Sequence, residues 1–435
     1  MKITSKSFVF FFSLICVQTT LFAQKRELLV HRAHQAITNV IVHDIFSPPV
    51  ASRIYLYANI AAHESMVASG KSQSFHALRN DFIQPSPVGF EGRVHPEASA
   101  VYAMMLTASK LVFSEARLID SLAAIAAAFN EVEPARLAAS MEWATAVSNA
   151  VLLWSKTDRY ADTRKMRRYS LIKDKSAWSP TPPGYFAPVE PHWGKMRTVV
   201  LDTLSKFQPK RPIPFSDSAG SPFYRQADQV FRHTKTMSKE DSAIALFWDC
   251  NPFHLTVQGH LNFATKKLSP GGHWMSIAGI ASRQSNASLE KSLQAYFFTS
   301  IALYDAFISC WDEKYRSNVI RPETYINAYL DQGWRPLLQT PPFPEYTSGH
   351  SVISAASAVV LTQIFGPDFK FRDDTEVPYG LPIRSFTSFW SAANEAAMSR
   401  FYGGIHYKGS IENGLKQGEA IGLKVVQSMK QGFKK

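Results

Sequence analysis

Helical periodicity is the feature that most limits the folds open to this chain. Four segments in its first third place apolar residues three and four positions apart and contain many alanines. They are residues 53–68, 97–113, 117–129 and 134–154. The same texture returns in residues 239–248, 289–318, 351–365, 386–400 and 411–429. Alternating, strand-like runs are scarce, so the sequence predicts an all-α fold built as a large helical bundle.

A tract rich in proline and aromatic residues, 178–222, separates the two helical regions. So many prolines exclude long helices, because proline lacks the backbone donor and clashes with the preceding turn. Its aromatic side chains, among them Trp178, Tyr185 and Trp193, favour a long ordered insertion over a disordered linker. We therefore expect an N-terminal helical half, 24–238, that includes this loop, and a C-terminal helical half, 239–435.

The first 23 residues have the pattern of a secretory signal peptide. Lys2 and Lys6 precede an apolar run, 8–17, that is too short to cross a bilayer, and Ala23 precedes a polar residue. We expect cleavage after Ala23 and a periplasmic or secreted mature protein. Cleavage there removes two lysines and no acid, so the formal net charge falls from +12 to +10. No later stretch reaches the roughly 18 unbroken apolar residues that a membrane helix needs.

The basic balance does not by itself indicate a nucleic acid or a membrane surface as the partner. Positive charge is spread along the chain, and its densest cluster, 164–168, lies beside a predicted loop. A solvated surface is the simpler explanation, and an anionic substrate or bound anion would account for part of the excess equally well.

Two cysteines remain after the expected cleavage. In an oxidising compartment Cys250 and Cys310 either form one disulfide or stay as two buried thiols, and the sequence leaves both possibilities open. So low a count argues against a cysteine-based metal site.

Two cations occur near the end of a predicted helix, in the segment 311–322. Lys314 and Arg321 are seven residues apart, so on one helix they share a face after two turns. Pro322 disfavours helical geometry at Arg321 and marks the end of the helix. Such a pair suits a multiply charged anion, although taken alone it also describes a solvated surface.

The second segment, Ser348-Gly349-His350, directly precedes the predicted helix 351–365. At a helix amino terminus, free backbone N–H groups and the helix dipole favour an anion. Gly349 permits close approach of the backbone to a ligand. Taken alone, these residues describe a capped turn equally well.

The third segment places Arg400 and His406 on either side of a double glycine, 403–404. The glycines should end the helix that carries Arg400 and turn the backbone, so that His406 faces the same pocket. A lone histidine is usually a satisfied core or surface group. Here it follows an arginine, and the other two segments precede it in order.

Together, Lys-x6-Arg-Pro, Ser-Gly-His and Ser-Arg-x5-His resemble the three-part pattern of the superfamily that joins vanadium-dependent haloperoxidases to type 2 phosphatidic acid phosphatases. The match spans residues 311–410. The resemblance implies a helical enzyme that binds vanadate, or phosphate as its isostere. It implies that Lys314, Arg321 and Arg400 neutralise the oxyanion, and that Ser348 and the amide of Gly349 donate hydrogen bonds to it.

The resemblance also gives the two histidines separate roles. His406 would be the apical group, which is the vanadium ligand in a haloperoxidase and the phosphorylated nucleophile in a phosphatase. His350 would be the acid–base residue, which activates peroxide in one case and protonates the leaving group in the other. Trp311 and Phe343 resemble the aromatic residues that line the halide side of the fungal chloroperoxidase pocket.

These details favour a vanadium-dependent haloperoxidase that oxidises halide with hydrogen peroxide in the presence of a small organic acceptor. The alternative is a secreted acid phosphatase that acts on a phosphate ester through a phosphohistidine. A third possibility is a degenerate phosphate- or vanadate-binding protein. Neither a nucleic acid partner nor an integral membrane span is expected.

One position departs from the family pattern, which usually has an aspartate four residues after the apical histidine. Here that residue is Ser410. The aspartate orients the imidazole and raises its basicity, whereas serine brings no negative charge. A phosphohistidine mechanism should suffer more than vanadate binding, because the nucleophile must be activated. Glu412 or a backbone carbonyl is the expected substitute, and Asp249 or Asn251 is expected to support Arg400.

Overall fold

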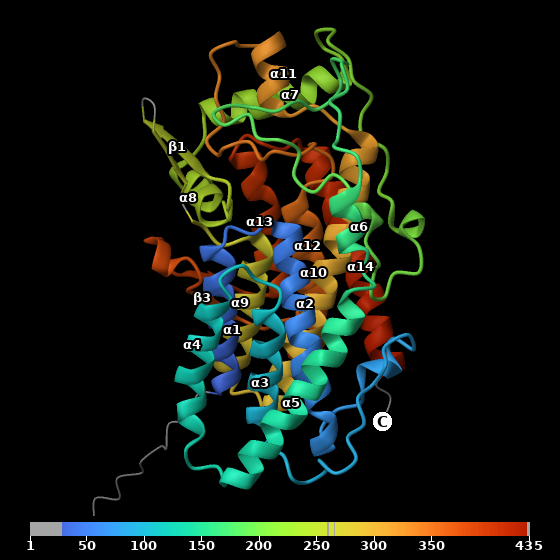
Figure 1. Ribbon diagram of the computed structural model, residues 1–435. Coiled ribbons are helices and arrows are strands. Elements are labelled where there is room, and N and C mark those ends of the chain that lie inside the picture. The colour runs from blue at the N-terminus through green and yellow to red at the C-terminus, as the bar shows by residue number, and fades with distance from the viewer. Residues whose placement is uncertain (1–27, 259–260, 265, 433–435) are drawn as a thin grey trace, which may run out of the picture.

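The computed structural model describes residues 28–258, 261–264 and 266–432, so the expected signal peptide and its cleavage site lie outside the described residues. The described chain contains fourteen α-helices and two small two-stranded antiparallel sheets (Figure 1). The all-α prediction is confirmed. Among these residues, no helix is both long enough and apolar enough to cross a membrane.

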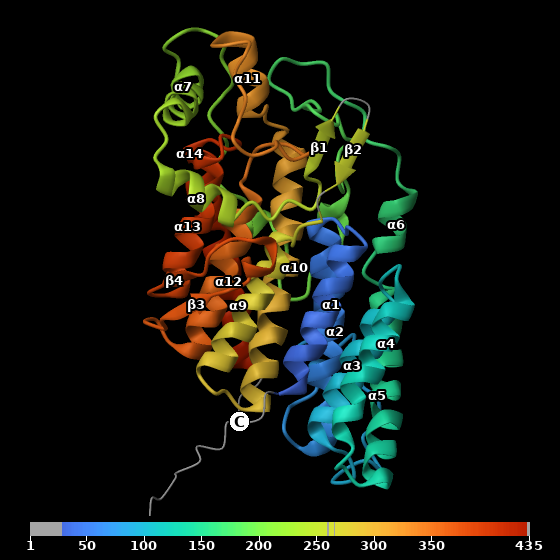
Figure 2. The same cartoon turned by 90° about the vertical axis from the view of Figure 1, so that its left-hand side faces the viewer.

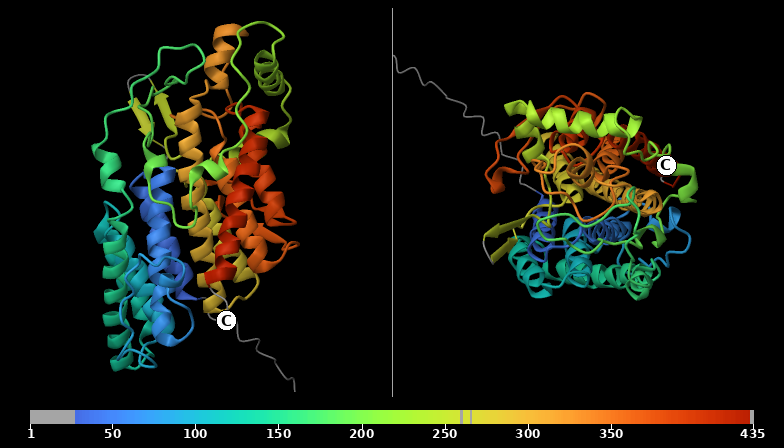
Figure 3. Two further views of the ribbon diagram at one scale, coloured as in Figure 1. Left: turned by 90° about the vertical axis from the view of Figure 1, so that its right-hand side faces the viewer. Right: turned by 90° about the horizontal axis from the view of Figure 1, so that it is seen from above.

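Most of the long helices run roughly parallel in two groups that lie side by side (Figure 2; Figure 3, right). The first group comprises α1 (Leu29–His43), α2 (Pro48–Ser65), α3 (Pro96–Ser109), α4 (Glu115–Ala126) and α5 (Pro134–Ser155). The second comprises α9 (Pro270–Gln284), α10 (Leu289–Ser317), α12 (Gly349–Phe365), α13 (Phe389–Tyr402) and α14 (Lys408–Gly432). Helices α2 and α10 pack across the boundary between them, and one cluster of buried apolar residues runs through both.

Shorter elements surround these two groups. The remaining helices are α6 (Tyr160–Lys165), α7 (Pro222–Lys235), α8 (Lys239–Phe247) and α11 (Pro322–Tyr329). The strands are β1 (Leu255–Gln258) paired with β2 (Leu261–Ala264), and β3 (Phe371–Asp373) paired with β4 (Arg384–Phe386). Helices α7 and α11 pack together at one end of the molecule (Figures 1 and 2).

A row of glycines on α14 lets this helix approach α12 closely. Gly414, Gly418 and Gly422 follow one another at four-residue spacing, so they share one face of α14. A Cβ atom built on Gly418 would lie 2.0 Å from the backbone oxygen of Val352, where no side chain fits. This contact fixes the position of α12, the helix that begins at Gly349.

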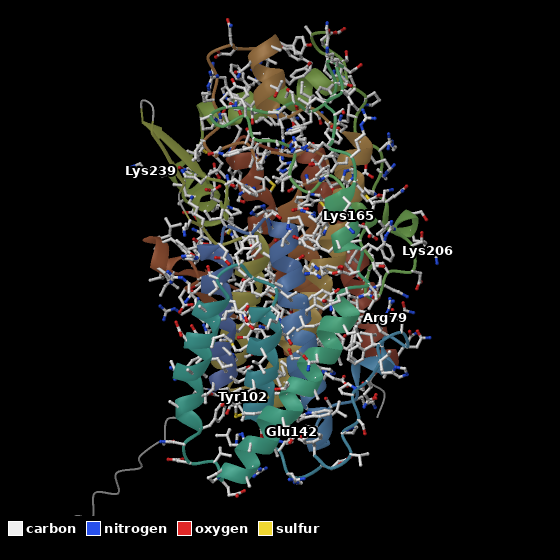
Figure 4. The ribbon with its side chains drawn as sticks, viewed as in Figure 1. Arg79, Tyr102, Glu142, Lys165, Lys206 and Lys239 are labelled. Atoms are coloured by element: carbon white, nitrogen blue, oxygen red, sulfur yellow. The ribbon has the colours of Figure 1, made fainter. Side chains whose placement is uncertain are left out.

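The proline- and aromatic-rich insertion is ordered, as predicted. The backbone N–H of Trp178 donates to Asn318 O at 2.9 Å, and that of Val189 donates to Pro342 O at 3.0 Å. The segment thereby covers the end of the second helical group at which α10 stops. Near it, the basic cluster 164–168 is exposed apart from the half-buried Met166, and Lys165 lies at the surface in Figure 4.

The sequence analysis located nine helices to within a few residues but missed α1, α6, α7, α9 and α11. Two of them were missed because they begin with residues typical of turns. Helix α9 begins with Pro270-Gly271-Gly272 after the N-cap Ser269, and α7 begins at Pro222 after the N-cap Ser221. Proline is tolerated in the first helical turn, where its missing N–H is not needed. Pro48 and Pro49 likewise form the first turn of α2, which therefore begins before its predicted start at residue 53.

Candidate active site

The three chemistry-bearing segments meet around one cavity. Six of the nine predicted site residues line it: Trp311, Phe343, Gly349, His350, Arg400 and His406. The other three, Lys314, Arg321 and Ser348, are buried and do not line it. Pro48 of α2 and the segment 249–253 complete much of the wall.

Lys314 and Arg321 do not share a helix face, and that prediction is wrong. Helix α10 ends at Ser317, and Asn318 adopts a left-handed conformation with a φ of 48° that reverses the chain. Arg321 is extended and caps α11, whose first residue is Pro322. The two cations therefore approach each other through a turn rather than through helical periodicity.

Lys314 holds the loop that precedes α12 in place through hydrogen bonds. Its ammonium donates to the backbone oxygens of Pro344 at 3.0 Å, Glu345 at 3.1 Å and Thr347 at 2.5 Å. An ammonium has three N–H donors, so all of them are engaged. Lys314 therefore contributes positive charge to the site and holds the loop, but has no free donor in this arrangement.

Arg321 reaches the imidazole of His406. Its Nε donates to Phe343 O at 2.9 Å, and its Nη1 donates to Ile405 O at 3.0 Å and lies 3.2 Å from His406 Nε2. Its Nη2 is buried and has no hydrogen-bond partner among the described residues. One edge of the guanidinium is thus anchored, and a donor remains open beside His406.

Arg400 is held from the other side of the cavity. Its Nη1 donates to the backbone oxygens of Trp248 at 2.8 Å and Asp249 at 3.2 Å, and its buried Nε has no partner among the described residues. Asp249 thus supports Arg400 as expected, through its backbone carbonyl and through the charge of its carboxylate, which favours the charged guanidinium. The carboxylate of Asp249 also pairs with Lys267 at 2.5 Å.

His350 lies in the first turn of α12, which begins at Gly349, two residues earlier than predicted. Ser348 is the N-cap, and its Oγ accepts the N–H of Ser351 at 3.4 Å, which leaves the serine's own hydrogen available for donation. The ring of His350 hydrogen-bonds to the backbone of Trp248, and its Nε2 has no partner among the described residues. Burial and the nearby Arg400 hold the pKa of His350 well below its usual value, so the ring is neutral.

His406 is oriented by a buried carboxylate. Its Nδ1 lies 2.7 Å from Glu345 Oε1, which also accepts the backbone N–H of Tyr407 at 3.1 Å. Burial, followed by the charges of Arg321 and Lys314, holds the pKa of His406 well below its usual value. A neutral ring must carry its single hydrogen on Nδ1 to donate to Glu345. Nε2 then carries a lone pair, as a ligand or nucleophile requires, and here it accepts from Arg321 Nη1 at 3.2 Å.

Glu345 supplies the carboxylate that the sequence pattern lacks at position 410. Ser410 Oγ lies 3.5 Å from His406 Nδ1 and also hydrogen-bonds to Glu345. The expected substitute, Glu412, is exposed and does not provide the carboxylate that orients His406. Sequence reasoning missed Glu345, although it is the one acidic residue in the segment 341–350, and it is only 1% exposed.

The site carries an excess of buried positive charge. Lys314, Arg321 and Arg400 are each no more than 1% exposed, and burial lowers the pKa of all three. Glu345 is the carboxylate that opposes Lys314 and Arg321, and burial raises its pKa. Buried cations are stable only when paired, and an anion in the cavity would pair them. The unpartnered donors of Arg321 and Arg400 therefore fit a tetrahedral oxyanion such as vanadate or phosphate.

An aromatic wall borders these cations. The rings of Trp311 and Phe343 are 4.9 Å apart, and the Lys314 ammonium and the Arg321 guanidinium each lie 5.1 Å from the centre of the Phe343 ring. Cations over ring faces at this distance are attracted by the π electrons. Trp311 Nε1 donates to Val189 O at 3.1 Å, so the insertion also positions this wall.

Known proteins match both the sequence and this structure. A family model described as the VCPO second helical-bundle domain matches residues 294–435. A solved structure described as the first bacterial vanadium-dependent iodoperoxidase is 44% identical, with a TM-score of 0.86, and the match covers 92% of this chain and 96% of that chain. Holo- and apo-type bacterial vanadium-dependent chloroperoxidases share the fold at 16% identity and a TM-score of 0.68, over 89% of this chain and 94% and 95% of theirs. No curated protein matches the chain.

Proposed function

Because this chain belongs to the vanadium-dependent haloperoxidase family and is an enzyme of that type, we propose that it oxidises iodide with hydrogen peroxide at a vanadate bound to His406. The observation that carries the proposal is the neutral imidazole of His406, whose Nε2 faces buried cations with open donors. Iodide is chosen because the relative that shares 44% of its residues with this chain is described as an iodoperoxidase.

The candidate site residues divide into those that would hold the oxyanion and one that would move protons. Arg321 and Arg400 would donate their open N–H groups to vanadate, and Ser348 and Gly349 would donate from the start of α12. His406 Nε2 would be its ligand. When bound, vanadate supplies Lewis-acid chemistry towards hydrogen peroxide.

His350 is suited to accept a proton. Burial holds the pKa of His350 well below its usual value, so the ring is neutral and carries one hydrogen. With that hydrogen donated to the Trp248 carbonyl, the unpartnered Nε2 would carry a lone pair. A neutral imidazole can take a proton from hydrogen peroxide and later return it to the departing oxygen.

The overall reaction consumes iodide, hydrogen peroxide and one proton. Iodide loses two electrons, and hydrogen peroxide gains two as its O–O bond breaks. One proton is consumed, and hypoiodous acid and water are formed. A small organic acceptor would then react with hypoiodous acid.

Trp311 and Phe343 provide an aromatic wall beside the buried cations, which suits a large, weakly hydrated anion.

A phosphatase remains the second candidate because of Glu345. The missing aspartate at position 410 was the reason to expect a weak phosphohistidine mechanism, and Glu345 supplies a carboxylate to the same imidazole nitrogen. The same observation weakens the case for a degenerate binding protein. The donors that suit vanadate also suit phosphate.

Parallel assays on the purified enzyme separate these candidates. The protein is freed of bound anions, orthovanadate is added, and peroxide-dependent oxidation of iodide, bromide and chloride is measured beside hydrolysis of an aryl phosphate. We expect iodide oxidation that requires vanadate, that phosphate suppresses by competition, and that is accompanied by negligible hydrolysis. Hydrolysis that vanadate inhibits, with no halide oxidised, would establish the phosphatase instead.

A further inference from the structure

A second cluster of chemically active side chains adjoins the cavity, and one of its members, Cys250, is part of the cavity wall. Cys250, His273 of α9 and Glu376, which follows β3, are buried and converge with their potential ligand atoms within 4.8 Å of one another. Cys250 and Cys310 are both free buried thiols, so no disulfide forms between them. The haloperoxidase chemistry described above uses none of the three clustered residues.

The three atoms are spaced like ligands of one ion. Cys250 Sγ lies 3.3 Å from His273 Nδ1 and 3.6 Å from Glu376 Oε1, and His273 Nδ1 lies 3.3 Å from Glu376 Oε1. In a tetrahedral zinc site, bonds of about 2.3 Å to sulfur and about 2.0–2.2 Å to nitrogen or oxygen place neighbouring ligand atoms roughly 3.3–3.6 Å apart. The three distances between the sulfur, nitrogen and oxygen atoms are therefore close to those between three ligands of a tetrahedral zinc ion.

The two nitrogens of His273 have different surroundings. Nε2 makes a direct hydrogen bond of 2.8 Å to Asp373 Oδ2, whereas Nδ1 lies 3.3 Å from both the thiol and the carboxylate. A single hydrogen on Nδ1 cannot serve both, and a charged N–H bonded to a carboxylate is typically about 2.7–2.9 Å long. A carboxylate on one nitrogen and an ion on the other is the usual arrangement of a metal-bound histidine.

We propose that Cys250, His273 and Glu376 bind a zinc-class divalent cation, with Asp373 orienting the histidine and water in the fourth position. The low cysteine count had argued against a cysteine-based site, but the fold adds a histidine and a carboxylate from distant parts of the chain. A divalent cation would also compensate the buried carboxyl groups of Asp373 and Glu376, together with the thiolate that Cys250 would form on binding it.

The ion would stabilise the segment that holds Arg400. Cys250 directly follows Trp248 and Asp249, whose carbonyl oxygens accept the Arg400 guanidinium. The Trp248 ring also stacks on His273, with 4.4 Å between the ring centres. Cys250 itself has a φ of 41°, a conformation that residues with a side chain seldom adopt. Binding at Cys250 would therefore fix one wall of the active-site cavity without taking part in halide oxidation.

Metal analysis of the full enzyme, purified without chelators, tests this site independently of activity. We expect about one equivalent of zinc per chain, and on substitution with cobalt an absorption band from thiolate-to-cobalt charge transfer. Cys250→Ser should lose the zinc and the band. Cys310→Ser is the matched control, because it removes the other buried cysteine and should keep both.

The wild-type protein decides the question even if a variant fails to fold. Zinc no higher than in the buffer, together with no charge-transfer band after cobalt is added, would overturn the proposal. His273 would then be an imidazolium held between Asp373 and Glu376 without an ion. Equal metal content in both cysteine variants would also refute the assignment of Cys250 as a ligand.

Discussion

Replacing His406 with alanine is expected to abolish iodide oxidation, with a loss of at least about a thousand-fold at saturating vanadate and peroxide. Burial lowers the pKa of His406, so its ring is neutral, and Nδ1 donates the ring's one hydrogen to Glu345. Nε2 therefore carries a lone pair. Alanine removes that nitrogen and leaves the three buried cations and the donors of Ser348 and Gly349 to retain the oxyanion. Initial rates of iodide oxidation measure the effect.

A histidine outside the site provides the control for this variant. His76 is exposed and is bonded through its ring to the backbone oxygen of Phe82, far along the chain from the catalytic segments. His76→Ala should oxidise iodide at close to the wild-type rate. If His406→Ala also kept more than about a tenth of that rate, His406 would not be the ligand, because loss of a metal ligand costs more than loss of its supporting group.

Replacing Glu345 with glutamine is expected to lower turnover about 10–100-fold, the range typical for loss of a group that supports a metal-bound histidine. Glutamine can still accept the Nδ1 hydrogen, but a neutral acceptor bonds about half as strongly and polarises the ring less. The variant also makes the pocket more positive, which by itself favours anion binding. Turnover at saturating vanadate is therefore the quantity to compare.

A second substitution distinguishes positioning of His406 from a general effect on the fold. Ser410 Oγ lies 3.5 Å from His406 Nδ1, so an aspartate at 410 can bring a carboxylate to the same nitrogen. The double variant Glu345→Gln with Ser410→Asp should recover most of the lost turnover. If the glutamine variant turned over normally, or if the double variant showed no recovery while remaining folded by circular dichroism, Glu345 would not orient His406.

Nine of the helices and the three candidate site segments were predictable because their signals are local. Apolar periodicity defined α10 and α12 within one or two residues at each end. The roles of Ser348, Gly349 and His350 depend on a helix start, which a short stretch of sequence reveals. The turn between Arg400 and His406 was equally visible, since Gly404 has a φ of 78° that glycine adopts without strain.

What the sequence did not reveal depends on contacts between distant residues. Glu345 and His406 are 61 positions apart, and nothing local to either predicts their hydrogen bond. The convergence of Lys314 and Arg321 depends on the left-handed turn at Asn318, a single residue that periodicity does not detect. The metal-binding geometry around Cys250 likewise requires α9 and the turn after β3 to be placed first.

The most direct test of the central claim is a crystal structure of the enzyme loaded with vanadate, with vanadium located by its anomalous scattering. We predict one vanadium peak at bonding distance from His406 Nε2, with the open N–H groups of Arg321 and Arg400 directed to its oxygens. A pocket without vanadium at saturating vanadate, or a peak bonded to another residue, would contradict the assignment of His406 as the ligand.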